Sequence, residues 1–275
     1  MRHFISILVL SFLIIGCGQK DVSKIVVDPG FSSYVNAFSS GVISNQSTIK
    51  VVLLEPNANA NPGNPITDEL FQFSPEIEGQ AYWVDAQTIE FRPFNNLPSG
   101  ESFVVNFELG KLIEVPSKFK MLEFGFIVIN QSLFVSFEGL STTDIDKPEV
   151  QELFGTLRTS DVADPSKIES CLKASQDAKD LDIKWEHTKG SKTHKFTVVG
   201  VTRGEEESFV NLVWNGENIG SESEDQKEIR IPPLGEFTLV QINTVRKPGL
   251  YFSIQFSDPV DPKQDLTGLV HLKSG

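Results

Sequence analysis

Cysteine carries the most reactive side chain in this 275-residue chain, and it occurs only at Cys17 and Cys171. Asp164 and Pro165 are typical of a helix start, with an N-cap followed by proline at the first helical position. We expect Cys171 to fill core space on the buried face of that helix and not to act as a nucleophile. The residues expected on this face are Ile168, Cys171, Leu172 and Ser175.

His187 and His194 flank the polar loop of a predicted hairpin, where they could approach closely enough to share a metal ion. Two histidines without a third ligand at suitable spacing are a weak metal motif. We therefore expect exposed hairpin residues and no metal site.

Acidic side chains recur at Asp258, Asp261 and Asp265, but this segment lacks the glycine and final glutamate of an EF-hand loop. Turn and capping roles are favoured for them, and Glu205–Glu207 is expected at a solvated hairpin tip. No Gly-x-Ser-x-Gly elbow, Walker loop or dinucleotide fingerprint occurs in the sequence. We predict no catalytic residues, no cofactor and no metal, so the chain is not expected to be an enzyme.

The elements that would position any site are β-strands. In the stretch from Phe71 to Gly110, apolar residues recur at a spacing of two, which places them on one face of a strand. Turn residues lie between these runs, at Asp85-Ala86 and again from Asn95 to Gly100. The residues expected to face the core are Trp83, Ile89, Phe91, Phe103, Val105, Phe107 and Leu109.

Composition and charge narrow the possible functions. The chain is 39% hydrophobic and contains 21 Phe, enough to fill the cores of two domains. Its formal net charge of −13 repels phosphate backbones, so we expect no nucleic-acid partner.

The first sixteen residues have the pattern of an export signal: Arg2 and His3, then an apolar run to Ile15 that is too short for a membrane span. The tail Ile14-Ile15-Gly16-Cys17 resembles the lipobox of bacterial lipoproteins. The resemblance implies cleavage before Cys17, acylation of that residue, and a lipid anchor in the outer membrane on its periplasmic or surface side. Because an acylated Cys17 cannot pair with Cys171, no intrachain disulfide is expected.

We expect tandem antiparallel β-sandwich domains, macroglobulin-like or Ig-like, with a short helix in the second. The predicted division is a signal peptide over 1–16, a tether over 17–30, a first sandwich over 31–129, a second over 130–235, and the start of a third over 236–275. The third is inferred because Phe237–Pro259 repeats the apolar alternation of Tyr34–Pro56 without a gap, 203 residues later. A partial sheet of this kind indicates a chain truncated within its third domain.

Several segments together resemble the amino-terminal macroglobulin-like domains of bacterial alpha-2-macroglobulins: FSPEIEG, YWVDAQTIEFRPFNNLPSGESFVVNF, LDIKW, HKFTVVGVTR, LVWNG, IRIPP and FSDPVDPKQDLTGLVHL. The resemblance implies an envelope lipoprotein that entraps proteases when an exposed bait segment is cleaved. Some members also carry a thioester in a Cys-any-Glu-Gln motif. Here Cys171 is followed by Leu172, Lys173 and Ala174, so that motif is missing and the trap is expected beyond Gly275.

A second hypothesis is a surface adhesion or glycan-binding lipoprotein built from Ig-like repeats. A third, less favoured, is an accessory domain of an enzyme.

Overall fold

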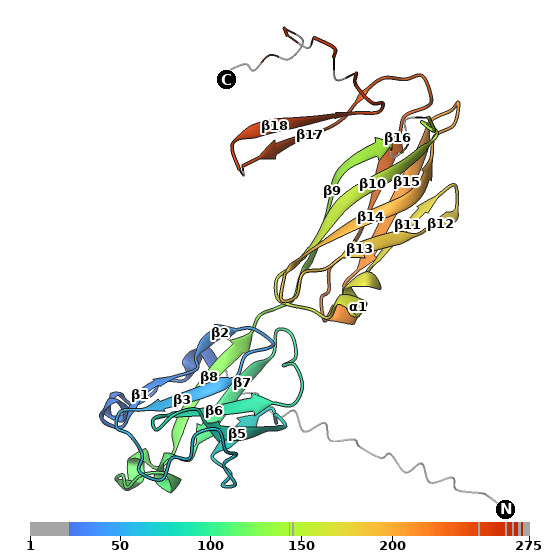
Figure 1. The fold of residues 1–275 in the computed structure, drawn as a ribbon. Coiled ribbons are helices and arrows are strands. Elements are labelled where there is room, and N and C mark those ends of the chain that lie inside the picture. The colour runs from blue at the N-terminus through green and yellow to red at the C-terminus, as the bar shows by residue number, and fades with distance from the viewer. Residues whose placement is uncertain are drawn as a thin grey trace, which may run out of the picture. The chain divides into compact units, whose positions relative to one another are not determined.

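The computed structural model describes residues 22–142, 144, 146–246, 248–261, 263–265, 267–268 and 271, and it is built mainly from antiparallel sheets (Figure 1). The expected mainly β fold with sandwich layers is confirmed. Contacts divide the chain into two compact units. The first consists of the segment up to Gly41 with Thr48–Asn95 and Ser102–Ile127, and the second of Val42–Ser47, Asn96–Glu101 and Val128–Gly275.

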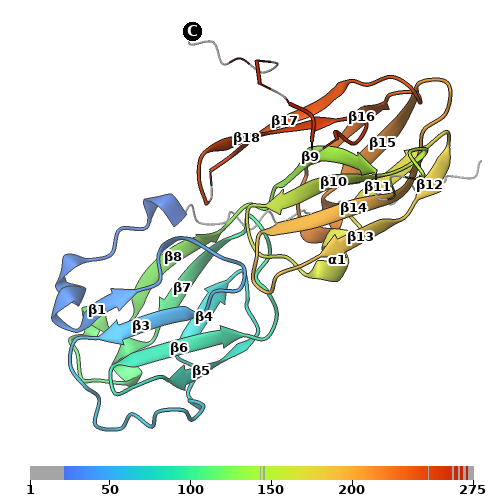
Figure 2. The same cartoon turned by 45° about the horizontal axis from the view of Figure 1, so that its top comes forward.

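The first unit contains two four-stranded sheets, ordered β1-β3-β6-β5 and β2-β8-β7-β4 (Figure 2). Short 3-10 turns η3 (Leu109–Lys111) and η4 (Ser117–Phe119) connect the last two strands. Its strands are β1 (Val35–Phe38), β2 (Gly41–Ile43), β3 (Ile49–Leu53), β4 (Phe71–Ser74), β5 (Gly79–Trp83), β6 (Thr88–Pro93), β7 (Ser102–Phe107) and β8 (Leu122–Val128).

The core of the first unit follows the period-two pattern. Trp83 pairs with Ile89 across the β5–β6 hairpin, and Phe103 pairs with Phe126 across β7 and β8. All seven residues predicted to face the core are buried. The turn after Trp83 is held by the Asp85 carboxylate, which accepts hydrogen bonds from the backbone N–H groups of Gln87 and Thr88 at 2.7 Å each.

Most of the segment expected as a tether, 17–30, falls within the described residues from Val22 onward. It forms the 3-10 turns η1 (Val22–Lys24) and η2 (Pro29–Ser33). Val22 and Ile25 lie over Gly125 of β8, where an added Cβ would come within 2.6 Å of Val22 Cγ1. A glycine therefore lets this segment lie directly against the sheet, and residues 22–30 are grouped with the first unit. The tether over 17–30 stays a prediction.

The second unit contains two further sheets, ordered β13-β14-β10-β9 and β12-β11-β15-β16. One hydrophobic cluster between them is filled mainly by Leu, Val and Ile, with Phe196 and Trp214. Its elements are β9 (Leu133–Thr142), β10 (Val150–Thr159), α1 (Pro165–Glu169), β11 (Leu172–Gln176), β12 (Lys179–Leu181), β13 (Ile183–Glu186), β14 (Thr193–Thr202), β15 (Ser208–Asn215), η5 (Glu217–Ile219) and β16 (Glu224–Ile231).

The predicted helix in this unit is real but shorter than expected. Asp164 caps it by accepting from the Ser166 N–H at 2.8 Å, and Pro165 occupies its first turn. The helix ends at Glu169, and Leu172 and Ser175 lie in β11, so the predicted helical face is wrong beyond Cys171. From Leu172 onward the backbone N–H and C=O groups pair with β15 instead of continuing the helix. The alternate burial of Leu172, Ala174 and Gln176 follows the strand period.

A two-stranded hairpin, β17 (Leu239–Val245) and β18 (Tyr251–Phe256), is grouped with the second unit. The boundary predicted at 236 therefore stays a prediction.

The hairpin allows a test of the proposed repeat. In β1–β3, Val35 pairs with Leu53 and the ladder is irregular before Ala37; in β17–β18, Leu239 pairs with Phe256 and the ladder is irregular before Gln241. Both segments therefore form an antiparallel ladder with an irregularity after its first pair. The gap-free alignment is wrong by one residue, because the first strands are 204 residues apart and the second strands 203.

Candidate functional site

Four clusters among the described residues could carry function. Cys17, the predicted lipidation site, lies outside the described residues. Cys171 is buried, and its thiol donates to the Lys167 carbonyl at a sulfur–oxygen distance of 3.2 Å. Burial raises the pKa of this thiol, which disfavours the reactive thiolate. The geometry agrees with a core-filling role.

The two histidines of the β13–β14 hairpin form a contact. The Nδ1 atoms of His187 and His194 are 2.8 Å apart, and His187 Nε2 lies 3.2 Å from Glu169 Oε1. His194 is only 1% exposed, so the expectation of two exposed residues is wrong. The inward alternation of β14, which also buries Phe196, carries the His194 ring into the protein.

Among the residues the structure describes, no three His, Cys, Asp or Glu side chains are gathered so that they could hold an ion. Because each Nδ1 must either donate or accept across the 2.8 Å contact, one of the two rings has to be neutral. Burial, followed by the charge of His187, lowers the pKa of His194 and favours its neutral form.

A third cluster surrounds Arg203, whose side chain is fully buried. Its guanidinium donates to the carbonyls of Pro232 and Pro233 at 2.9 Å each and to Asp258 Oδ1 at 2.9 Å. The hydrogen bond from Arg203 lowers the pKa of the Asp258 carboxyl. Arg203 therefore fastens both ends of the β17–β18 hairpin to the second unit.

Two of the acids near the hairpin have the turn-capping roles expected of them. Asp261 and Asp265 accept from the N–H groups of Lys263 and Thr267, each at 2.9 Å. Asp258 instead pairs with Arg203. Glu205–Glu207 is exposed as expected, but the predicted hairpin tip is wrong, because this segment connects β14 and β15 of two different sheets.

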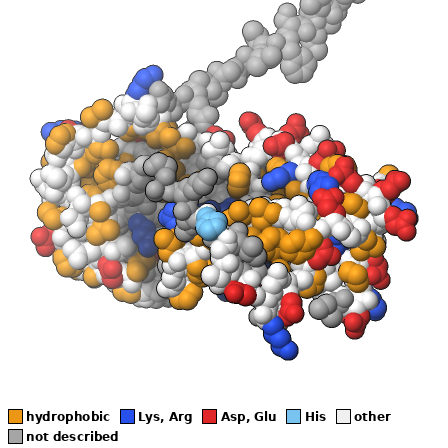
Figure 3. Space-filling view, turned by 90° about the horizontal axis from the view of Figure 1, so that it is seen from above, with side chains coloured by type: hydrophobic (Ala, Val, Ile, Leu, Met, Phe, Trp, Pro, Cys, Tyr) orange, Lys and Arg blue, Asp and Glu red, His pale blue; other side chains and the backbone are white. Residues whose placement is uncertain are grey.

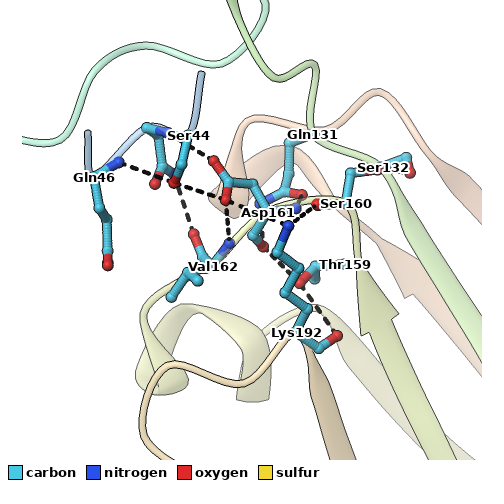
Figure 4. Close-up of polar contacts among 10 residues, drawn as sticks. Ser44, Gln46, Gln131, Ser132, Thr159, Ser160, Asp161, Val162 and Lys192 are labelled. Carbon is cyan, nitrogen blue, oxygen red and sulfur yellow. Dashed lines mark hydrogen bonds and ion pairs between the residues drawn. The ribbon is translucent and has the colours of Figure 1, made fainter. Parts of the chain in front are cut away.

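A fourth cluster is centred on the buried Asp161 (Figure 4). Its carboxylate accepts from Ser44 Oγ at 2.9 Å, from the Asn45 N–H at 2.6 Å and from the Val162 N–H at 2.8 Å. Its backbone exchanges two hydrogen bonds with the Gln131 side chain. Sequence reasoning missed this site because Ser44 and Asn45 lie more than a hundred positions from Asp161, and the residue types alone do not mark it. The arrangement satisfies the hydrogen-bonding needs of a buried carboxylate and joins separate segments of the chain, and the Ser44 hydroxyl is one of its donors.

The β17–β18 hairpin presents a surface of a different kind. Its polar face lies against β9, where Asn243 Nδ2 donates to the Glu138 carbonyl at 2.9 Å and the Gln255 side chain lies against Gly139. The opposite face is apolar and turned outward: Leu239 is 49% exposed and Phe252 48%. Figure 3, seen from above, shows hydrophobic side chains at the surface beside Asp and Glu. An amphipathic hairpin that turns its apolar face to water is incomplete as a folded sheet.

No family model and no curated protein match the chain. Among solved structures, L,D-transpeptidase 3 from Mycobacterium tuberculosis, in complex with a faropenem-derived adduct, is similar at 14% identity and a TM-score of 0.25 over 45% of this chain and 46% of that one. The chain thus spans about half of that protein. A chimeric titin Z1Z2 carrying a decorin peptide is similar at 8% identity and a TM-score of 0.32, over 74% of this chain and 99% of that one.

No described helix is long and apolar enough to cross a bilayer.

Proposed function

We propose that this chain is a non-catalytic scaffold and tether at the front of a larger alpha-2-macroglobulin-like envelope protein that traps proteases. The observation that carries the scaffold role is the outward apolar face of β17–β18. Burying such a face is worth about 25 cal/mol per Å² of apolar surface, so a partner sheet would be strongly favoured.

The first unit supplies the comparison for that partner sheet. Ile49, Val51 and Leu53 of β3 are buried there, and they correspond to Phe252, Ile254 and Phe256 of β18. Phe124 of β8, in the opposing sheet, contacts Phe38 of β1 with ring centroids 5.0 Å apart. By analogy, the outward face of β17–β18 becomes the inner face of a third sandwich when further strands cover it.

The family assignment rests on the order of the sequence segments that resemble macroglobulin-like domains. On this proposal the target proteases are bound by parts of the protein outside this chain. Cys171 is buried and lacks the thioester motif, so it takes no part in trapping. The two described units serve to space and support the trap.

The tether part of the proposal rests on Cys17. A Cys17→Ala chain expressed in its host should lose labelling by a radioactive fatty acid, whereas a Cys171→Ala chain should keep it. Persistent labelling of the Cys17→Ala chain would rule out the lipid anchor.

The inhibitor part is tested by the coding sequence after codon 275 and by an assay. Further macroglobulin-like domains are expected, and tandem copies of one Ig-like unit would instead favour the adhesion or glycan-binding alternative. The purified chain should leave the activity of a general protease unchanged. Inhibition by this chain alone would contradict the placement of the trap elsewhere.

A further inference from the structure

The open side of the first sandwich contains a hollow of about 580 Å³, here called the edge hollow. It lies between β4 and β5, which are the end strands of the two different sheets. Residues 66–70 and 76–79 also line it. The hollow belongs to the first unit alone, so its geometry does not depend on the rest of the chain.

The floor of the edge hollow is aromatic. Phe71 and Phe91 line it with ring centroids 5.6 Å apart, and Phe73 packs behind them at 4.6 Å from Phe91. Phe94, also in the lining, is 68% exposed. An exposed aromatic ring next to a buried apolar floor is suited to bind the aliphatic or cationic side chains of a ligand.

The rim of the hollow is acidic. Asp68, Glu69, Glu76 and Glu78 are all exposed, and the lining contains no Lys or Arg. One cation lies nearby, because the Lys111 ammonium donates to the Glu69 carbonyl at 2.7 Å. Four carboxylates beside a single ammonium leave an excess of negative charge, which favours a basic ligand.

The third observation is a free strand edge. The Leu70 carbonyl accepts from the Glu108 N–H at 2.9 Å, so this pair is a hydrogen-bonded one in the β4–β7 ladder. Because the pairs alternate, Phe71 and Phe73 point their N–H and C=O groups away from β7. β4 is the end strand of its sheet, so these groups are placed to pair with an added strand.

We propose that the edge hollow binds an extended peptide segment of another protein, one that alternates basic and apolar residues. The peptide adds to the β4 edge, its apolar side chains rest on the aromatic floor, and its Lys or Arg side chains reach the acidic rim. This proposal is independent of the protease-trap function.

The test uses the purified chain and two fluorescent peptides, one alternating Lys with Val and one alternating Glu with Val, followed by fluorescence anisotropy. The basic peptide should bind and the acidic one should not. A Glu76→Gln/Glu78→Gln chain should bind the basic peptide about 3- to 10-fold more weakly. A matched Glu205→Gln/Glu206→Gln chain, with the same charge change in the second unit, should bind like the unchanged protein.

Strand addition makes a sharper prediction than charge. Alternate N–H groups of an extended peptide point to opposite edges, so methylating the nitrogens of all Lys residues or of all Val residues blocks one edge only. One of these two peptides should lose at least about tenfold in affinity and the other should bind like the unmethylated peptide. Equal behaviour of the two methylated peptides, equal binding of acidic and basic peptides, or equal effects of the two double substitutions would each overturn the proposal. So would self-association of the chain that competes with the peptide.

Discussion

At the residue scale, side chains that fill space are easier to predict than those that hold a charge. Trp83, Phe103 and Phe107 lie where the period-two pattern placed them, because one face of each strand must leave water. His194 and Asp161 are buried although their types predict exposure. Asp161 accepts hydrogen bonds from Ser44 and Asn45, which lie more than a hundred positions away, and no local pattern carries that information. His194 contacts the nearby His187 across the β13–β14 hairpin, and the alternation along β14 is what buries its ring.

Trp83→Ala should lower the free energy of unfolding of the first unit by about 3 to 5 kcal/mol, because it leaves a large cavity under β5. Urea denaturation followed by circular dichroism measures this change. Val84→Ala, at an exposed neighbouring position, should change the stability by less than about 0.5 kcal/mol. A cost below about 1 kcal/mol for Trp83→Ala would mean that this ring is not part of the core.

His194 should make the stability of the second unit depend on pH. Its pKa in the folded protein is lowered by burial, and after that by His187, from the ordinary value of 6.5. The unfolded chain therefore binds a proton below about pH 6.5 that the folded chain resists, so stability falls as pH drops through this range.

The check is the midpoint of urea unfolding at pH 7.5 and at pH 5.5. The unchanged chain should lose stability on acidification, and His194→Gln should lose less. His271→Gln, at an exposed position, should behave as the unchanged chain does. Equal pH dependence in all three chains would show that His194 is not the responsible group.

At the element scale, the positions of the strands were easier to predict than which strands pair and in what register. The runs around Val51, Phe91 and Val105 are strands as predicted, since alternation reports burial on one face directly. The predicted helix continued too far because Leu172 fits both a helical and a strand period, and only pairing with β15 decides between them. The one-residue offset between the β1–β3 and β17–β18 ladders is a matter of register, which alternation alone does not fix.

The β11–β12 turn offers a test of backbone strain. Asp177 and Ala178 have φ angles of 50° and 60°, in the left-handed region that costs an L-residue about 1 to 2 kcal/mol. Ala178→Gly should therefore raise the free energy of unfolding by about 0.5 to 1 kcal/mol. Ala174→Gly, within β11, should lower it, and thermal unfolding of the two variants decides. Destabilisation by Ala178→Gly would show that the turn is not strained.

Arg203 tests how β17–β18 is held. Lysine keeps the charge but cannot make the forked contacts to Pro232, Pro233 and Asp258 together. In Arg203→Lys, amide hydrogens of β17 and β18 should exchange at least about tenfold faster, while those of β3 stay unchanged. Arg230→Lys, which alters an exposed pair with Glu207 and Glu236, is the control and should leave the hairpin unaffected. Unchanged exchange in Arg203→Lys would mean that other contacts hold the hairpin.

At the scale of the whole molecule, the proposed scaffold role rests on two compact units and a hairpin with an outward apolar face. The formal net charge of −13 keeps such a surface soluble and disfavours nucleic acid. The central claim is that this scaffold is the front of a larger envelope protein.

The mass of the native protein tests that claim most directly. An antibody raised against the first unit should detect, in the membrane fraction of the source cells, a protein much larger than the 30.5 kDa of this chain. Detection of a stable product of about 30.5 kDa, with no larger form, would contradict the account.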